Sequence, residues 1–320
     1  IPARLNVGLM LFLASFVSYM LRVNFSIIVI QMSTTNLTSE LTELHDTFNW
    51  DKQAQGLLLS AYFYGYIFPN LLGGTLAEIY GGRLVIFIAM FLSAIITALS
   101  PFAAQDDFIY MFIMRLVLGI LAGFFYPASH QLISKWSPLD EKGKFVFTLM
   151  GGIFGTVVSW PLTGFLVEHY GWRLGFHVPA AFAFIISFLW LYFVHDSPRT
   201  HPRISKGEKE MIENSVGGSD KKKAWPPLQD VFTCPRFYAL LFLHFGGTFG
   251  LFFLITAAPK FMSEVLQFKL TEAGILSSIP YLARLIFGFV FGQIGDSLKQ
   301  RNILSTTSIR KVFCIFCKYF

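Results

Sequence analysis

Long apolar runs alternate with short polar stretches along the whole chain. Each run holds about 20 or more predominantly apolar residues, which is the length that an α-helix needs to cross the hydrocarbon core of a bilayer. The pattern therefore predicts an all-α, polytopic membrane protein with eight spanning helices. They are expected near residues 7–30, 54–77, 84–104, 108–133, 145–167, 176–194, 237–259 and 273–295.

The longest polar stretch, residues 196–236, divides six predicted spans from two. We expect three units: an N-terminal six-helix bundle (1–195), a linker (196–236), and an incomplete C-terminal bundle of two spans and a short apolar stub (237–320). Within the linker, Ser205 and Glu208 have the spacing of a capping box, in which each side chain bonds the other residue's backbone N–H. This spacing predicts a short helix that follows Ser205.

Composition supports a lipid environment. The chain is 54% hydrophobic and 14% charged, whereas about a quarter of the residues are charged in a soluble domain. Too few charges are present to cover a soluble exterior. The net charge of +6 does not indicate a nucleic-acid partner, because the basic residues are distributed among loops. Cys234, Cys314 and Cys317 have the spacing of neither a disulfide framework nor a zinc site.

The sorting of Lys and Arg predicts the orientation. Seventeen lie on the side of the N-terminus and linker, and four lie on the other side. Because cytoplasmic loops carry the excess of Lys and Arg, we expect the N-terminus and the linker to be cytoplasmic. The opposite side then holds the glycosylation acceptor Asn36, in Asn36-Leu37-Thr38.

A motif recurs at corresponding places in the two parts of the chain. A glycine-rich helix end with a carboxylate and a basic residue closes the second span and again closes the eighth. Internal repeats of this kind are typical of secondary transporters. A carboxylate beside a tight glycine turn can hold adjacent helices together, so we interpret both copies as a cytoplasmic gating motif, although plain charged helix ends are the simpler alternative. Its residues are Gly74, Glu78, Gly81 and Arg83, and then Gly292, Asp296 and Arg301.

The motif between spans 2 and 3 resembles the signature of the major facilitator superfamily, and further motifs are similar to its anion:cation symporter family. That family holds sialin, the vesicular glutamate transporters and the type I sodium-phosphate cotransporters. The resemblance implies a major facilitator fold with a six-helix N-terminal half, here followed by an incomplete C-terminal half. It is carried by Leu21-Arg22-Val23-Asn24, Arg115 with Gly119 and Gly123, Tyr126-Pro127-Ala128-Ser129-His130, Lys135-Trp136-Ser137-Pro138, Gly171-Trp172-Arg173, Ser197-Pro198, His201-Pro202, Pro280-Tyr281-Leu282 and Leu304-Ser305-Thr306-Thr307.

Two arginines inside predicted spans are the main candidates for substrate binding. Arg22 lies deep in span 1, where an unpaired cation costs at least a few kcal/mol. By resemblance it matches a basic residue that binds the substrate anion; a structural hydrogen-bonding role is the alternative. Arg115 in span 4 resembles a second cavity arginine, with an ion pair to Asp106 or Asp107, or snorkelling to the interface, as the alternative.

His244 and Arg284 complete the predicted substrate-binding set. Arg284 lies in the middle of span 8 and must face protein or water because of its charge. His244 in span 7 is either a polar cavity group or an interhelical hydrogen-bonding residue. Proton-coupled members of the family usually carry glutamate in span 4, where this chain has Leu118 and Ala122. The glutamate-transporting branch also carries a histidine in span 2 and an arginine in span 7, where this chain has Leu59 and Gly247. By resemblance the chain is therefore closer to the phosphate and organic-anion branch than to the glutamate transporters.

The predicted function is secondary active transport of a small anion, inorganic phosphate or an organic anion, across the plasma or endolysosomal membrane. No Gly-Lys-Ser/Thr nucleotide loop is present. We expect no cofactor, with Na⁺ as the coupling ion and H⁺ as the second choice. A membrane enzyme is disfavoured because the seven histidines lack metal spacing.

A truncated, non-transporting isoform or fragment is the alternative function. The resemblance implies twelve spans, and this chain stops soon after the eighth. We therefore expect that residues 1–320 alone show no substrate-specific transport and that a chain extended by four spans does.

Overall fold

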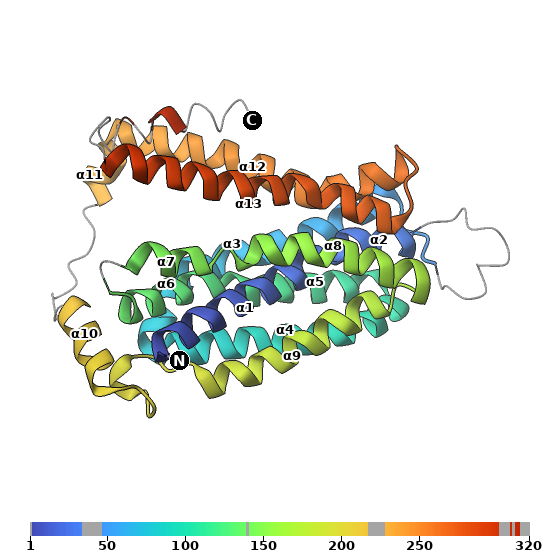
Figure 1. The fold of residues 1–320 in the computed structure, drawn as a ribbon. Helices are drawn as coiled ribbons and strands as arrows, with labels where there is room; N and C mark the ends of the chain where they lie inside the picture. Colours follow the sequence, from blue (N-terminus) through green and yellow to red (C-terminus); the bar gives the residue numbers. More distant parts are fainter. Residues whose placement is uncertain are drawn as a thin grey trace.

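The protein is described by a computed structural model that covers residues 2–33, 47–138, 141–216, 228–300, 308 and 311–313. Long helices run side by side along one axis (Figure 1). Within the described ranges all regular secondary structure is helical, as the sequence predicts. We call the end that holds Pro2, the α3–α4 turn and α10 the linker end. The opposite end, where α2 ends and α3 begins, is the far end.

Eight long helical segments correspond to the eight predicted spans. The first, fourth and fifth spans each consist of two helices separated by a short interruption, and the others are single helices. In chain order the segments are α1 (Ala3–Val23) with α2 (Phe25–Met32), α3 (Lys52–Tyr80), α4 (Gly82–Asp106), α5 (Phe108–Gly123) with α6 (Phe125–Trp136), α7 (Lys142–Thr148) with α8 (Gly151–Tyr170), α9 (Leu174–Phe193), α12 (Pro235–Glu264) and α13 (Leu270–Gln300).

The interruption at Asn24 divides the first span, and polar side chains surround it. Ser26 Oγ donates to the carbonyl of Val23 at 2.7 Å, and Trp160 Nε1 donates to the same carbonyl at 3.3 Å. Asn24 Nδ2 donates to the carbonyl of Gly175 at 3.2 Å. In a membrane span a break in the helix is tolerated where neighbouring side chains satisfy the freed backbone groups.

Seven of the eight segments are long and apolar enough to cross a membrane, among the residues that the structure describes. The exception is α3, which is long enough at 29 residues but is more polar. Gln53, Gln55 and Asn70 are among its residues. This polarity is consistent with a helix that faces other helices and not only lipid.

The first six segments form one bundle around α1. α1 packs against α8 and α9, while α3 packs against α5 and α4 packs against α9. The core contains the fully buried side chains of Trp136, Trp160, Trp172 and Trp190. Large buried aromatic side chains therefore form part of the core of the bundle.

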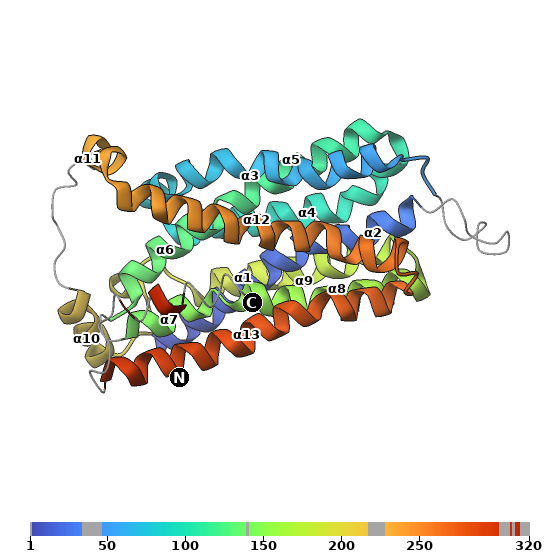
Figure 2. The same ribbon diagram turned by 90° about the horizontal axis from the view of Figure 1, so that it is seen from above.

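α12 and α13 meet this bundle over their far-end parts. α13 packs against α8, and α12 packs against α2 and α13 (Figures 1 and 2). Ile255, Ala273 and Tyr281 are buried there. Toward the linker end the residues of both helices are mostly exposed, and Gly246, Gly250, Gly288 and Gly292 have no described atom within 4 Å of an added Cβ. These glycines therefore do not bring α12 or α13 into close contact with another described helix.

The linker contains a short 3-10 turn, η2 (Pro198–Thr200), and the helices α10 (Lys206–Val216) and α11 (Leu228–Thr233). Half of the predicted capping box forms, because the backbone N–H of Glu208 donates to Ser205 Oγ at 3.3 Å. The other half does not. The Glu208 carboxylate instead accepts from the backbone N–H groups of Ala3 and Arg4, at 3.0 Å each. Glu208 therefore caps α1, whose own N-cap residue, Pro2, has no side-chain acceptor.

Candidate functional site

Arg22 lies at the C-terminal end of α1, in the middle of the bundle. Its side chain is 5% exposed. Its guanidinium carbon lies between 4.4 and 5.3 Å from the centroids of five aromatic rings, those of Tyr19, Tyr62, Phe63, Tyr66 and Phe252. Four of these rings belong to α1 and α3, and the fifth belongs to α12. A cation enclosed by ring faces is attracted to their π-electrons, by about 2 kcal/mol when desolvated.

Arg115 on α5 lies near the same tyrosine ring, that of Tyr62. It is 4% exposed, and its guanidinium carbon lies 4.4 Å from the ring centroid of Phe25 and 5.2 Å from that of Tyr62. The guanidinium of Arg22 also lies 5.2 Å from the Tyr62 centroid. One tyrosine ring therefore contacts both buried cations.

Glycines bring α3 and α5 close enough for this contact. A Cβ on Gly119 would lie 1.9 Å from the carbonyl oxygen of Tyr62, and one on Gly65 would lie 2.1 Å from that of Leu116. No side chain fits at either position, so the two backbones touch. Gly119 follows Arg115 by one helical turn, and this spacing sets Arg115 against Tyr62.

Among the described residues, some N–H groups of the two arginines have no hydrogen-bond partner. Nε and Nη2 of Arg22 and Nε of Arg115 are buried without a hydrogen bond. Within the described part of the chain, no carboxylate forms an ion pair with either guanidinium. Asp106 and Asp107, which the sequence offered as partners of Arg115, are exposed. Buried cations are normally paired, and these donors are positioned to hydrogen-bond an acceptor.

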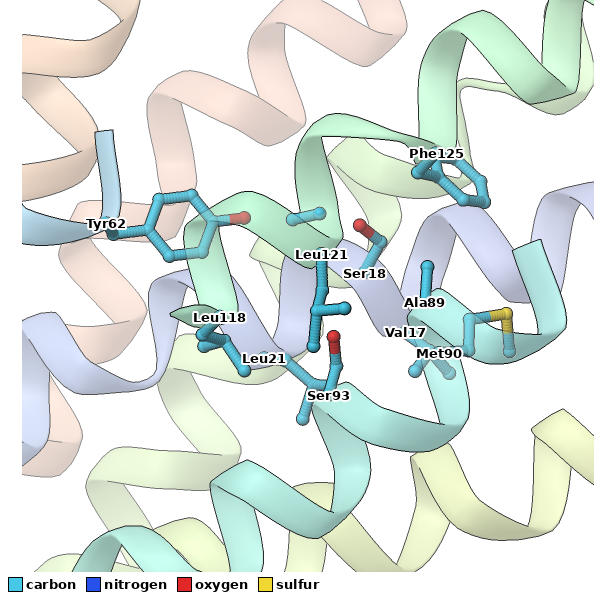
Figure 3. A pocket seen from close by; sticks show the side chains of 11 residues that line it. Val17, Ser18, Leu21, Tyr62, Ala89, Met90, Ser93, Leu118, Leu121 and Phe125 are labelled. Carbon is cyan, nitrogen blue, oxygen red and sulfur yellow. The ribbon is translucent and has the colours of Figure 1, made fainter. Parts of the chain in front are cut away.

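A narrow pocket lies beside Tyr62, between α1, α4 and α5. Figure 3 shows the hydroxyl groups of Tyr62, Ser18 and Ser93 among aliphatic side chains. Leu118 and Ala122 also line it. None of its lining residues can exchange a proton near neutral pH. The pocket therefore offers hydroxyl groups, but no carboxylate, next to the two arginines.

At the linker end, the turn between α3 and α4 is held by contacts that we call the latch, and these involve Gly81 and Arg83 of the first copy of the predicted motif. Gly81 has φ +90°, and a Cβ there would lie 2.6 Å from the carboxylate of Asp196. That carboxylate accepts from the backbone N–H of Arg83 at 2.9 Å. Arg83 Nη2 donates to the carbonyl of Leu191, and Trp190 Nε1 donates to the carbonyl of Arg83 at 2.9 Å. The α3–α4 turn is thereby fastened to the end of α9.

The carboxylate that meets the Gly81 turn is that of Asp196. Glu78 lies exposed near the end of α3, and its part in the motif stays a prediction. Gly74 lies beside Pro127 of α6, with a Cβ distance of 4.0 Å. In the second copy Gly292 is exposed on α13. The side chain of Asp296 and all of Arg301 lie outside the described residues, so their part in a latch stays a prediction.

Two histidines next to the latch have lowered pKa values. Burial lowers the pKa of His195, and the charges of Arg83, His201 and Arg203 lower it further. Burial is also the largest cause of the lowered pKa of His201. The ring centroids of the two histidines lie 4.6 Å apart. The linker end therefore favours neutral imidazoles at this position.

The other predicted substrate-binding residues are not buried like the arginine pair. His244 on α12 and Arg284 on α13 are both exposed. Asn36 lies outside the described residues. The structure brings Arg22 and Arg115 together, and it leaves the roles of His244, Arg284 and Asn36 as predictions.

Three residues of these sites could not be recognised from the sequence: Tyr62, Asp196 and Trp190. Tyr62 is one of many aromatic residues in α3, and its spacing carried no signal. Asp196 directly follows the sixth span, so its position at a helix end was the only available indication. Trp190 looked like an ordinary apolar residue of the span.

Comparison with known proteins connects the chain to one family. The family model described as Major Facilitator Superfamily matches residues 11–320. The uncharacterized transporter slc-17.2 of Caenorhabditis elegans is 34% identical over 96% of this chain and 68% of its own length. Sialin of Ovis aries is 33% identical over 98% of this chain and 67% of its own length. This chain spans 54% to 68% of the length of the curated relatives that it matches.

Among solved structures, the fold is similar to that of a bacterial homologue of the human lysosomal transporter Spinster. The TM-score is 0.66 at 17% identity, with 94% of this chain and 64% of the other covered. At this identity the similarity concerns the fold alone. The fold and the relatives are those of transporters, which are not enzymes.

Proposed function

The chain belongs to the Major Facilitator Superfamily and, within it, to the anion:cation symporter group that includes sialin, and we propose that it contributes to the secondary active transport of a small anion. The cargo is inorganic phosphate or an organic anion. Transport occurs by alternating access, in which one binding site faces the two sides of the membrane in turn.

The pair of buried arginines at Tyr62 carries this proposal. Two guanidinium groups with unpaired N–H donors lie in the interior, and no described carboxylate neutralises them. A guanidinium binds carboxylate or phosphate through two parallel hydrogen bonds. An anion with two or more oxygens satisfies the free donors of Arg22. The ring faces around it exclude water and strengthen that interaction.

We propose Na⁺ as the coupling ion, with H⁺ as the alternative. The pocket beside the arginine pair is lined by Leu118 and Ala122 and lacks a carboxylate. A proton carrier in this place would need a group that titrates near neutral pH. The choice of Na⁺ itself rests on the resemblance to the sodium-phosphate cotransporters.

The proposed membrane is the plasma or endolysosomal membrane, with the linker end in the cytoplasm. The 17 to 4 distribution of basic residues supports this orientation. Glycosylation of Asn36 and protection of residues 221–223 from protease in intact cells test it. Cleavage of the linker from the side that carries the glycan would overturn the topology.

Uptake by the protein reconstituted in vesicles tests the function. The assay compares labelled phosphate with mono- and dicarboxylates, each under an inward Na⁺ gradient, a pH gradient, or neither. We expect saturable uptake of at least one anion that depends on a gradient. Uptake of neutral solutes in preference to every anion would contradict the proposal. Vesicles with Arg22→Ala, matched for the amount of protein inserted, separate specific uptake from leak.

A further inference from the structure

Polar contacts join the six-helix bundle to α12 and α13 at the far end. The first is made by Glu168 in the last turn of α8. Its Oε2 accepts from the backbone N–H of Thr271 at 3.0 Å and from Thr271 Oγ1 at 2.7 Å. Thr271 is the second residue of α13, where backbone N–H groups lack partners inside the helix. A carboxylate of one part of the protein therefore caps a helix of the other.

The backbones of α8 and α13 are also in close contact at this end. A Cβ on Gly164 would lie 2.5 Å from the carbonyl oxygen of Leu270, and one on Gly274 would lie 2.5 Å from that of Trp160. The Trp160 ring then packs edge-on against Tyr281, with centroids 5.2 Å apart. Glu168 thus lies at the outer rim of a tightly packed interface.

A second polar contact joins α3 to α12. Lys260 Nζ donates to Gln55 Oε1, and Gln55 is buried. Glu264 pairs with Lys260 at 3.6 Å and with Lys52 of α3 at 3.8 Å. Lys52 is exposed, so its ion pair adds little, whereas the buried amide of Gln55 makes the Lys260 contact the stronger one.

The linker end of the same interface differs. From Pro235 to Gly250 on α12 and from Ile286 to Ile294 on α13, nearly every side chain is exposed. Within the described part of the chain, no hydrogen bond or ion pair joins these stretches to the bundle. The two parts of the protein are therefore closed against each other at the far end and separate at the linker end. Farther in, Phe252 of α12 lies over the guanidinium of Arg22, at 4.4 Å.

We propose that Glu168 and Thr271, supported by Gln55 and Lys260, form the gate that closes the far-end access to the arginine site. The inference rests on the proposed transport function. To expose Arg22 to the far side, α12 and α13 must move away from α8 and α3, and both polar contacts must break. Glu168 and Thr271 act on the position of these helices and not on the anion.

Cysteine accessibility without substrate tests this gate. A reporter cysteine replaces Ser277, which is buried on α13 behind the gate, in a protein whose Cys234, Cys314 and Cys317 are serine. A membrane-impermeant methanethiosulfonate is applied from the far side. We expect Glu168→Ala to raise the labelling rate at least 10-fold, because the gate opens more often. Thr271→Val should raise it by a smaller factor, because the backbone N–H still donates.

Glu272→Ala is the matched control. Glu272 is an exposed carboxylate in the same turn of α13, but its Oε2 accepts from the backbone N–H of Lys269 in its own segment, at 3.3 Å, and not from the six-helix bundle. Its replacement should leave the labelling rate unchanged. Thr271→Val keeps the size of the side chain, so it tests the gate even if Glu168→Ala reduces the amount of folded protein.

The outcomes separate the gate from the proposed function. Unchanged far-side labelling in both Glu168→Ala and Thr271→Val would overturn the gate, even if anion uptake is observed. Faster labelling in both variants supports the gate, and it does so whether or not any anion is transported, since no substrate is present. Labelling that rises equally from both sides would indicate general loosening of α13 and would also overturn the assignment.

Discussion

The six-helix bundle and the α12–α13 pair both carry basic residues within apolar helices, but the predicted substrate-binding ones are buried in the bundle and exposed in α12 and α13. In the most apolar 18-residue stretch of α1–α2, 78% of the residues are buried, against 6% in α12. Arg22 and Arg115 are enclosed by aromatic rings. Arg284 and His244 lie on exposed faces.

The difference shows how much the energetic cost of a charge in lipid predicts about the surroundings of an arginine. The charge of an arginine inside a span predicts that the residue avoids lipid. It does not say which groups surround it. For Arg22 these groups are four aromatic side chains of α1 and α3 and one of α12, all among the described residues. Arg284 is exposed, so the structure does not show which groups would surround its charge, and its role stays a prediction.

Removing one arginine from each region is the strongest test of whether the buried and the exposed arginines differ in function. We expect Arg22→Ala to lower anion uptake at least 100-fold, because the free donors of the guanidinium are lost, and Arg22→Lys to restore little, since an ammonium cannot form the two-pronged contact. Arg284→Ala should lower uptake by a smaller factor. Initial uptake rates, normalised to inserted protein, provide the measurement. Equal losses for Arg22→Ala and Arg284→Ala would place both arginines in one site.

Glycines provide the second test, on stability. Gly119→Ala should lower the free energy of unfolding by about 1–3 kcal/mol, since its methyl group overlaps the carbonyl of Tyr62. Gly288→Ala on α13 meets no described atom within 4 Å and should be neutral or stabilising by up to about 1 kcal/mol, as alanine favours helix. Thermal unfolding in detergent measures both. A Gly119→Ala variant as stable as the parent would contradict the close α3–α5 contact.

Much of the fold could be predicted from the sequence because span lengths are set by the bilayer. The predicted spans coincide with the helices, and the glycine turn at Gly81 was recognised from its motif. What could not be predicted was the choice of partner. The carboxylate that meets the Gly81 turn is Asp196, more than a hundred residues away, and Glu208 caps α1 and not its own helix. Such long-range contacts depend on how helices assemble, which local spacing does not encode.

The cap on α1 provides a third and smaller test. Glu208→Ala should lower the free energy of unfolding by about 1 kcal/mol, the usual cost of losing a helix cap, because the N–H groups of Ala3 and Arg4 lose their acceptor. Glu210→Ala on the same helix is the control, since Glu210 is exposed. Proteolysis within α10 should become faster in the first variant alone. Equal behaviour of the two variants would mean that the cap adds no stability to the bundle.

The smallest expected effect is a dependence of stability on pH that originates in the bundle and not in α12. The pKa of His195 is lowered by burial and by the charges of Arg83, His201 and Arg203, with Asp196 opposing them. The pKa of His201 is lowered mainly by burial and also by Arg203, while a hydrogen bond to the backbone of Phe193 and the charge of Glu208 oppose the shift. The folded protein therefore favours the neutral imidazoles. Above the unfolded pKa of about 6.5 both states are neutral and this stability is fully present. It is lost as the pH falls through the lowered folded pKa, because the unfolded chain then binds more protons.

The melting temperature should decrease between pH 7.5 and pH 5, by less than Glu208→Ala lowers it. The double variant His195→Gln with His201→Gln should reduce this decrease, while His244→Gln on the exposed face of α12 should leave it unchanged. A pH dependence that disappears with His244 and persists without His195 and His201 would reverse the assignment of the sensitive region.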